Sequence, residues 1–368
     1  MALIKDIYSK EFYDRFSKSL AVVRPGNNAA SFTRKVMNKN FAGMEWKERM
    51  QHTTVTLHDY LPEKFPAAAR TITKLIRQLR KDGWNGGLEF MFLPDYIATY
   101  GLDHFDASAE ALEEITQFIS AEFAVRPFLL KYGQRMLEVM TGWSMHPHYA
   151  VRRLASEGSR PRLPWAMAIP SLKADPAPLF PLLENLKTDP HEWVRRSVAN
   201  HINDIAKDHP HVVLQFAKNW KNISAETDGI IRHGSRTLLK KGHPEILAYF
   251  GLDDKGIGWQ DFTIHTPKVK EHDKLKFSFS VQNQTKKPVT IRLEYAVHFL
   301  RANGQLSPKV FKISERSYAA GELVTLTREH SFKPITTRVY YQGPHKVSLI
   351  INGREKEVAD FVYGSRKY

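Results

Sequence analysis

The sequence predicts two domains of different class, an all-helical array of repeats over residues 1–255 and an all-β sandwich over residues 256–368. Three observations predict this division: the spacing of apolar residues, a motif that recurs in the first part, and a hairpin signal in the second. The chain has 368 residues, a length typical of two domains.

Apolar residues in the first part recur at three- and four-residue spacing, as in Leu112, Ile115, Phe118 and Ile119. This spacing places them on one face of an amphipathic helix. The pattern continues to about residue 255, so we expect helices throughout this part.

One helical motif occurs twice and continues a third time. HPHYAVRRLASE at 146–157 aligns with DPHEWVRRSVAN at 189–200, an offset of 43, and IRH at 231–233 follows at an offset of 37. Periods near 40 with a proline before a helix are typical of HEAT-like helix pairs, which stack into a solenoid with a concave face. We therefore predict an α-solenoid.

The last part alternates with a period of two. Val289, Ile291 and Leu293 alternate with polar residues, and a later apolar run ends at Asn352-Gly353, a strong signal for a two-residue hairpin turn. The Gly- and Asp-containing segment 251–258 interrupts both periodicities, so we place the boundary there.

The charge balance predicts a polyanionic partner. There are 54 Lys+Arg against 39 Asp+Glu, a net charge of +15, which favours nucleic acid or an anionic surface. From residue 256 onward the counts are 19 and 10, so the smaller domain is the more basic. The chain has no cysteine, which excludes disulfides, thiolate metal sites and a catalytic cysteine.

No segment has the apolar character of a membrane span. The N-terminal sequence MALIKDIYSKEFYDRF lacks the apolar core of a signal peptide, and no stretch has 18 consecutive apolar residues. We therefore expect a cytoplasmic protein without membrane association. We also expect a monomer without a protein partner.

When the repeats are placed in register, polar residues four apart form a ladder along one face. Arg153 and Glu157 belong to the first repeat, and Arg196, Asn200 and Asp204 to the second. Stacked repeats would set these groups side by side in a concave basic groove that also holds acids. The same spacing also fits ordinary ion pairs, Arg153 with Glu157 and Arg196 with Asp204.

The segment SEGSRPRLPW at 156–165 places Arg160, Arg162 and Trp165 in a short turn where a helix must end. Such a turn could hold a phosphate and a base or sugar, although a tryptophan by itself is more often a core residue, which is the alternative for Trp165. We expect Trp193 and Trp220 in the core, because each lies among apolar helix positions.

Other motifs carry no cofactor signal. The pairs His146/His148 and His209/His211 bracket prolines at repeat turns and lack the helical spacing of zinc ligands, so we interpret them as turns. GWNGG at 83–87 lacks the lysine of a phosphate-binding loop and is interpreted as a loop. We expect no metal and no cofactor.

Three long stretches resemble the AlkC branch of the HEAT-like-repeat DNA alkylation repair glycosylases, which are relatives of AlkD. They are SAEFAVRPF at 120–128, VRRLASEGSRPRLPW at 151–165 and VRRSVANHINDIAKDHP at 194–210. The C-terminal part resembles the immunoglobulin-like module that some members carry. Together these resemblances imply a solenoid followed by an Ig-like β-sandwich.

The resemblance implies a monofunctional DNA glycosylase that acts on cationic N-alkylated bases of the 3-methyladenine, 3-methylcytosine and 1-methyladenine class in double-stranded DNA, without base flipping. Such a base leaves neutral, and the sugar develops oxocarbenium-like charge that carboxylates can stabilise. Carried onto matching positions, the resemblance makes Glu122, Glu157 and Asp204 the catalytic carboxylates and Trp165 the lesion contact.

Further residues are candidates for DNA binding, with one arginine of each adjacent pair bracing a carboxylate instead. They are Arg152, Arg153, Arg160, Arg162, Arg195, Arg196 and Asn200 in the helical part and Lys286 and Lys287 in the β part. A non-catalytic HEAT-repeat scaffold that binds nucleic acid is the alternative. An iron-dependent dioxygenase would need two His and a carboxylate, and the β part offers no His-X-Asp pair.

Overall fold

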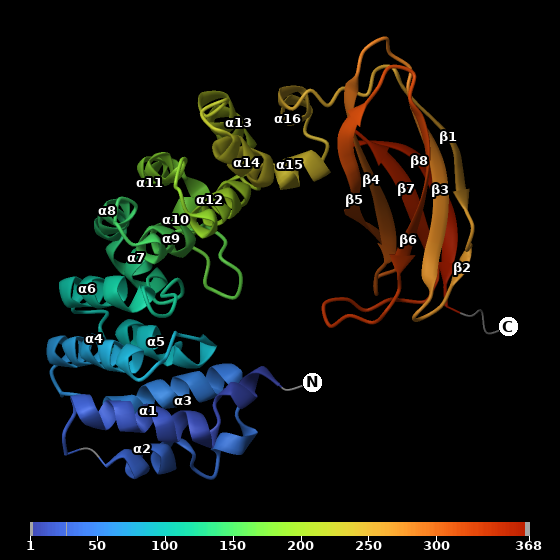
Figure 1. Ribbon diagram of the computed structural model, residues 1–368. Helices are drawn as coiled ribbons and strands as arrows, with labels where there is room; N and C mark the ends of the chain where they lie inside the picture. Colours follow the sequence, from blue (N-terminus) through green and yellow to red (C-terminus); the bar gives the residue numbers. More distant parts are fainter. Residues whose placement is uncertain (1–2, 27, 365–368) are drawn as a thin grey trace. The chain divides into compact units, whose positions relative to one another are not determined.

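The computed structural model describes residues 3–26 and 28–364, and it consists of helices followed by strands (Figure 1). By packing, the chain divides into two units, Met1–Gly234 and Ser235–Tyr368. Helices of the first unit are α1 (Lys10–Val23), α2 (Ala29–Val36), α3 (Trp46–His58), α4 (Phe65–Lys81), α5 (Phe92–Tyr100), α6 (Phe105–Thr116), α7 (Arg126–Tyr132), α8 (Gln134–Trp143), α9 (Tyr149–Gly158), α10 (Pro170–Ala174), α11 (Phe180–Leu186), α12 (Glu192–Ile205), α13 (Pro210–Asn219) and α14 (Ala225–Gly234).

The helices of the first unit stack in two rows (Figure 1). In the outer row α4 packs on α6, and α8 on α11. In the inner row α3 packs on α5, α9 on α12, and α12 on α14. The helices of each row bury their apolar side chains against the helices of the other row. Examples are Leu154 of α9, Leu183 of α11 and Val198 of α12. The predicted helical array is confirmed.

The repeated motif has a local structural reason. His148 precedes α9, and its Nδ1 accepts a hydrogen bond from the backbone N–H of Ala150 at 3.2 Å. His191 does the same for α12, accepting from the N–H of Trp193 at 3.2 Å. Each histidine therefore caps the start of an inner helix, where backbone N–H groups lack partners. Burial, with help from Arg80 and other nearby cations, lowers the pKa of His148, which favours the unprotonated form that can accept this hydrogen bond.

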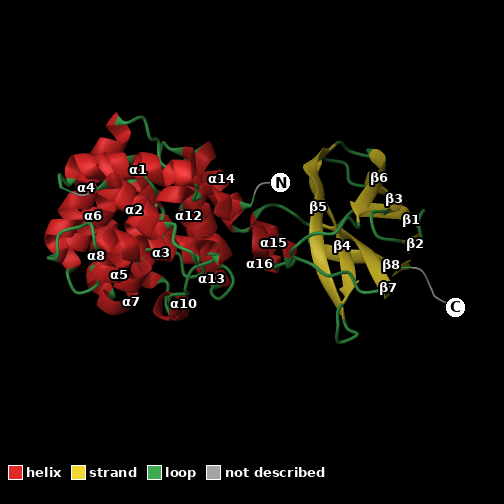
Figure 2. Ribbon diagram, turned by 90° about the horizontal axis from the view of Figure 1, so that it is seen from below, coloured by secondary structure: helices red, strands yellow, loops and turns green. Residues whose placement is uncertain are grey.

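Over its described residues, 235–364, the second unit contains two short helices and two β-sheets, and Figure 2 separates helices from strands by colour. One sheet has the order β1-β3-β6, and the other has the order β2-β8-β7-β4-β5. The elements are α15 (Arg236–Lys240), α16 (Pro244–Tyr249), β1 (Ile257–Ile264), β2 (Lys268–Val269), β3 (Lys274–Asn283), β4 (Val289–Leu300), β5 (Leu306–Tyr318), β6 (Leu323–Ser331), β7 (Gly343–Ile351) and β8 (Arg354–Tyr363).

The two sheets enclose an apolar core, as the period of two predicted. Ile291, Leu293 and Val297 of β4 are fully buried in it. The predicted hairpin joins β7 to β8, where Asn352 and Gly353 both have positive φ, 47° and 74°. Positive φ at both positions is what a type I′ turn requires.

The helices α15 and α16 pack with the strands. Gly242 approaches the hairpin so closely that a Cβ atom there would lie 2.4 Å from the carbonyl oxygen of Gly353. Asn352 Nδ2 donates to the carbonyl of Asp253 at 2.5 Å, and Asp254 pairs with Lys356 at 2.5 Å. Secondary structure therefore changes from helix to strand between α16 and β1, whereas the packing divides earlier, after residue 234. Among the described helices, none has the length and apolar composition needed to cross a bilayer.

Candidate active site

Two carboxylates of the inner helices meet at one arginine. Arg160 Nη1 donates to Glu157 Oε1 at 2.6 Å, and Arg160 Nε donates to Asp204 Oδ2 at 2.9 Å. Ser197 Oγ donates to Glu157 Oε2 at 2.6 Å, and Lys207 lies 3.0 Å from Asp204 Oδ1. Burial alone would lower the pKa of Arg160, but the two carboxylates raise it, so the guanidinium stays charged. Each carboxylate oxygen therefore has a protein donor.

The end of α9 brings these groups together. The helix ends at Gly158, where a Cβ atom would lie 2.5 Å from Cγ2 of Val125. Ser159 then donates its hydroxyl to the carbonyl of Ala155 at 2.6 Å, which closes the last turn. Arg160 follows directly and can reach back to Glu157, three residues earlier. A glycine at this position allows the close packing that the turn requires.

A second arginine, Arg126 at the start of α7, lies fully buried beneath this turn. Its guanidinium donates to three backbone carbonyls, those of Gly158 at 2.8 Å, Arg160 at 2.9 Å and Met167 at 2.7 Å. Burial, together with the charge of Arg160, lowers the pKa of Arg126 to about 10. Arg126 therefore fixes both ends of the loop that carries Arg160 and Trp165.

His201 on α12 is also fully buried. Neither ring nitrogen has a hydrogen-bond partner among the described residues. Burial lowers the pKa of His201 to about 3; Asp204 acts in the opposite direction and Arg160 in the same one. The imidazole is therefore neutral at physiological pH, and it leaves the charge of Asp204 to be balanced by Arg160 and Lys207.

Glu122 lies in the turn before α7 and pairs with a different arginine. Arg153 Nη1 lies 2.8 Å from Glu122 Oε2, and Ser120 Oγ donates to the same oxygen at 2.8 Å. The interpretation of the spacing as ordinary ion pairs, Arg153 with Glu157 and Arg196 with Asp204, is wrong. Arg153 reaches back across the repeat to Glu122, and Arg160 takes both Glu157 and Asp204.

A pocket of about 210 Å³ opens beside Glu157 on the inner row. Glu157 is only 6% exposed, yet it forms part of the pocket wall. The lining residues come from α9 and α12: Arg153, Glu157, Trp193, Arg196, Ser197 and Asn200. Asn200 Oδ1 also contacts His233 Nε2 at 3.2 Å, so the third repeat joins the ladder.

The expectation that Trp193 lies in the core is wrong. Its side chain is 63% exposed and borders this pocket, while its neighbour Val194 is fully buried. On a helix, adjacent residues point about 100° apart, so an apolar neighbour does not make Trp193 a core residue. Trp220 is buried, as expected, and its indole N–H donates to Glu184 at 2.8 Å.

Trp165 is not a core residue either. It is 88% exposed and has a positive φ of 64°, a conformation that bulky residues rarely adopt. It borders a second pocket on the inner row, together with Trp46 of α3 and Asp95 of α5. A strained and exposed tryptophan is the kind of residue that binding sites retain.

The candidate arginines fall into two classes. Arg152 binds Asp189 through Nε at 2.6 Å, and Arg162 binds Asp208 through Nη2 at 2.7 Å. Arg195 donates to the carbonyls of Asp189 and Pro190. Arg196 is exposed and makes no hydrogen bond or ion pair with another residue that the structure describes. The ladder therefore presents Arg196 with its full donor capacity.

Lys286 and Lys287 lie in the second unit, in the turn between β3 and β4, and both are exposed. Their side chains form no ion pair with a described residue, so their charges face solvent. The turn is fixed by Asn283, whose side chain donates to the carbonyl of Lys287 at 2.8 Å. Within residues 3–26 and 28–364, no three His, Asp or Glu side chains converge as metal ligands would.

Sequence reasoning missed Arg126, His201 and Ser197. Arg126 stands in an Arg-Pro pair at a helix start, which carries no signal of burial. Ser197 occupies the position that Leu154 has in the preceding repeat at the offset of 43, so a hydroxyl at an apolar position of the register was the available signal.

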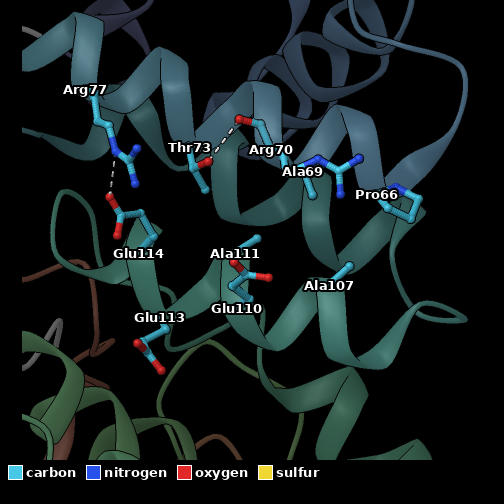
Figure 3. Close-up of a pocket in the computed structure, with 10 residues that line it drawn as sticks. All are labelled: Pro66, Ala69, Arg70, Thr73, Arg77, Ala107, Glu110, Ala111, Glu113 and Glu114. Atoms are coloured by element: carbon cyan, nitrogen blue, oxygen red, sulfur yellow. Dashed lines mark hydrogen bonds and ion pairs between the residues drawn. The ribbon is translucent and has the colours of Figure 1, made fainter.

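The outer row carries a different groove, between α4 and α6, which Figure 3 shows in close-up. Arg70 and Arg77 line one side, and Glu110, Glu113 and Glu114 line the other. Arg77 pairs with Glu114 at 3.3 Å in a partly exposed contact (Figure 3). Glu113 accepts from the indole N–H of Trp143 at 2.7 Å. Glu113 and Glu114 thus bind neighbouring helices, so these two acids have a structural explanation.

Comparisons with known proteins agree with this arrangement. A family described as DNA alkylation repair enzyme matches residues 108–238, which include the whole carboxylate network. A second family, described as "Uncharacterised protein YhaZ, C-terminal Ig-like domain", matches residues 258–363.

Two relatives match along nearly the whole chain. YhaZ of Bacillus subtilis (strain 168) is 41% identical over 98% of this chain and 99% of its own. The solved structure of the Pseudomonas fluorescens alkylpurine DNA glycosylase AlkC, bound to DNA containing an abasic site analog, is 34% identical with a TM-score of 0.92. That match covers 99% of this chain and 100% of the AlkC chain. The chain therefore belongs to the family of DNA alkylation repair proteins that includes AlkC and YhaZ, in which helical repeats precede an Ig-like domain.

Proposed function

We propose that this chain is a monofunctional DNA glycosylase that hydrolyses the N-glycosidic bond of cationic N-alkylated bases in double-stranded DNA. The observation that carries the proposal is Glu157, a carboxylate that is nearly buried and yet lines an open pocket with Arg153, Arg196 and Trp193. A surface that served only to bind phosphates would gain nothing from an acid at this place, because the acid repels the DNA backbone.

The chemistry requires a negative charge beside the sugar. An N-alkylated base such as 3-methyladenine, 3-methylcytosine or 1-methyladenine already carries positive charge and leaves neutral, so no acid has to protonate it. The sugar develops oxocarbenium-like charge as the bond breaks. Glu157 and Glu122 stabilise that charge, and either can orient the attacking water. Fixed donors, Arg160 on Glu157 and Arg153 on Glu122, hold the carboxylates in place.

In this proposal Asp204 acts indirectly, through Arg160. It is almost fully buried and shares Arg160 with Glu157, so it sets the position of the arginine that orients the catalytic acid. The pocket beside Glu157 is lined by charged, hydroxyl and amide groups with a single aromatic residue, and nothing there would sandwich a base on both faces. This supports cleavage without flipping the base into the pocket, in contrast to glycosylases that extrude their target.

DNA contacts come from both units in this proposal. Arg196 and Asn200 border the pocket, and Trp165 is exposed on the same row of helices. The exposed side chains of Lys286 and Lys287 bind backbone phosphates. Replacing both lysines by alanine should reduce the salt dependence of DNA binding by about two units of slope in log K against log salt.

Base release from DNA tests the proposal. Duplexes with a single 3-methyladenine or 3-methylcytosine are incubated with the full chain, and the free base is measured. We expect release by the wild type, a loss of at least about tenfold in Glu157→Gln, and no strand cleavage until the abasic product is treated with alkali. Glu138→Gln, an exposed acid on α8, is the matched control and should release base at the wild-type rate.

Binding without base release from either lesion would overturn the proposal. The chain would then be a DNA-binding scaffold, and the acids would be structural partners of the arginines.

A further inference from the structure

The pocket beside Glu157 is lined by one hydroxyl side chain, that of Ser197 on α12. In the repeat alignment at an offset of 43, Ser197 takes the position of Leu154 on α9, which is a fully buried apolar side chain. A serine at such a position gives up apolar burial and brings in a polar group that must find a partner. Packing alone therefore does not explain Ser197, and its hydrogen-bond partners point to another role.

The two carboxylate oxygens of Glu157 have different neighbours. Oε1 accepts a hydrogen bond from Arg160 at 2.6 Å, and Arg160 does not line the pocket. Oε2 accepts from Ser197 at 2.6 Å, and Ser197 does line the pocket. Since Glu157 and Ser197 share the pocket wall, Oε2 lies on the pocket side of the carboxylate. Oε2 is thus the oxygen that a substrate in the pocket meets.

A second hydroxyl determines where Ser197 directs its proton. The Oγ atoms of Ser197 and Ser156 lie 3.0 Å apart, both side chains are buried, and the contact of Ser197 with Glu157 is shorter. A hydroxyl has one proton to donate, and its hydrogen bond to a charged acceptor is the stronger one. Ser197 therefore donates to Glu157 Oε2, and its own oxygen accepts from Ser156. The hydroxyl of Ser197 is thereby held in the direction of the carboxylate.

We propose that Ser197 is a positioning residue that holds Glu157 Oε2 toward the sugar of the lesion; the inference rests on the proposed function. A carboxylate oxygen has two lone pairs, and the second one of Oε2 accepts from the attacking water. Oε2 takes the proton of that water as the water oxygen bonds to C1′ of the sugar. The electron pair of the N-glycosidic bond stays on the base, which leaves neutral. Without Ser197 the carboxylate is held only at Oε1 and loses this alignment, which slows the step.

Single-turnover base release by the full chain tests this role, with 3-methyladenine in duplex DNA and the protein in excess at varied concentration. The titration separates the maximal rate constant from the protein concentration that gives half of it. Ser197→Ala should lower the maximal rate constant about tenfold and change the half-saturating concentration by less than about twofold, because the hydroxyl aligns the acid and does not hold the DNA. Ser197→Thr keeps the hydroxyl and should restore most of the rate.

A double-mutant cycle with Glu157→Gln shows whether Ser197 acts through the acid. In the Glu157→Gln background, Ser197→Ala should change the maximal rate constant by less than about twofold, because the carboxylate that it positions is already gone. A purely structural role would give the same factor in both backgrounds. Ser108→Ala is the matched control and should release base at the wild-type rate. Ser108 of α6 is fully buried, donates to the carbonyl of Gly101 at 2.8 Å, and does not line the pocket.

Thermal melting establishes that each variant is folded, and the double-mutant cycle decides the matter if Ser197→Thr does not fold. Equal factors in the two backgrounds, or a wild-type rate for folded Ser197→Ala, would overturn the positioning role. A loss of the same size in Ser108→Ala would also overturn it, because the rate would then follow the removal of any buried hydroxyl. Wild-type release that does not respond to Ser197→Ala refutes this inference alone, whereas no release by the wild type refutes the proposed function.

Discussion

Removing the buried guanidinium of Arg160 should cost far more stability than removing the exposed guanidinium of Arg162, two residues away. Arg160 pairs with Glu157 and Asp204, and all three side chains are almost fully buried. Arg162 pairs with Asp208 through two hydrogen bonds at 3.0 and 2.7 Å, but that pair is partly open to solvent. The two substitutions therefore differ chiefly in burial.

The magnitude follows from what remains after Arg160→Met. Two buried carboxylates lose their common cation, and breaking a buried pair costs about 3–5 kcal/mol. Ser197 still donates to Glu157, and Lys207 still pairs with Asp204, so we expect the lower end, about 3 kcal/mol. The matched variant Arg162→Met breaks a pair worth about 0–1 kcal/mol.

Urea denaturation followed by far-ultraviolet circular dichroism measures both costs in the full chain, since the signal reports mainly the helices. If Arg160→Met costs no more than Arg162→Met, the carboxylates are not held as described, and the reasoning about Glu157 fails with them.

Three further predictions concern single residues. Because the pKa of His201 is about 3 in the folded chain and 6.5 as its reference value, acidification protonates the unfolded state first. The unfolding free energy of wild type should therefore fall as the pH is lowered from about 7.5 to about 4.5. In urea denaturation, His201→Leu should lose about 3 kcal/mol less than wild type over this range, and an equal loss would contradict the low pKa of His201. Gly86→Ala should lower the free energy of unfolding by about 3 kcal/mol or more in the same assay, because φ at Gly86 is 78° and a Cβ atom would lie 2.1 Å from the carbonyl oxygen of Phe118. A decrease of less than about 1 kcal/mol would refute this prediction. Trp193→Ala should change stability by less than about 0.5 kcal/mol, since the side chain is exposed, yet weaken DNA binding by about 1–3 kcal/mol in a fluorescence-anisotropy titration; unchanged affinity would remove Trp193 from the interface.

Much of the fold follows from local patterns. The period of two in β4 and the Asn-Gly hairpin are local signals, and the structure has both. The packing of α15 and α16 with the strands is not local, because it depends on the close approach of Gly242 to Gly353, more than 100 residues later in the chain.

The candidate site, too, could be predicted only in part from local sequence patterns. Helical register and the repeat offset brought Glu157 and Asp204 to one face, since both are periodic features. The partner of each acid depends on which arginine bends back across a turn, and Arg160 lies outside the periodic part of α9. Arg126 was missed for the same reason, because its partners are backbone carbonyls, which any sequence provides.

The ion pairs within the chain determine how many counterions the candidate DNA-binding arginines can release from DNA. Arg152, Arg153, Arg160 and Arg162 each neutralise a carboxylate, so they displace few condensed cations when DNA approaches. Six phosphate-binding arginines would give a slope of about −5 in log K against log salt, whereas Arg195 and Arg196 alone give about −2. Affinity carried by this segment should thus survive at ionic strengths that detach an ordinary basic groove.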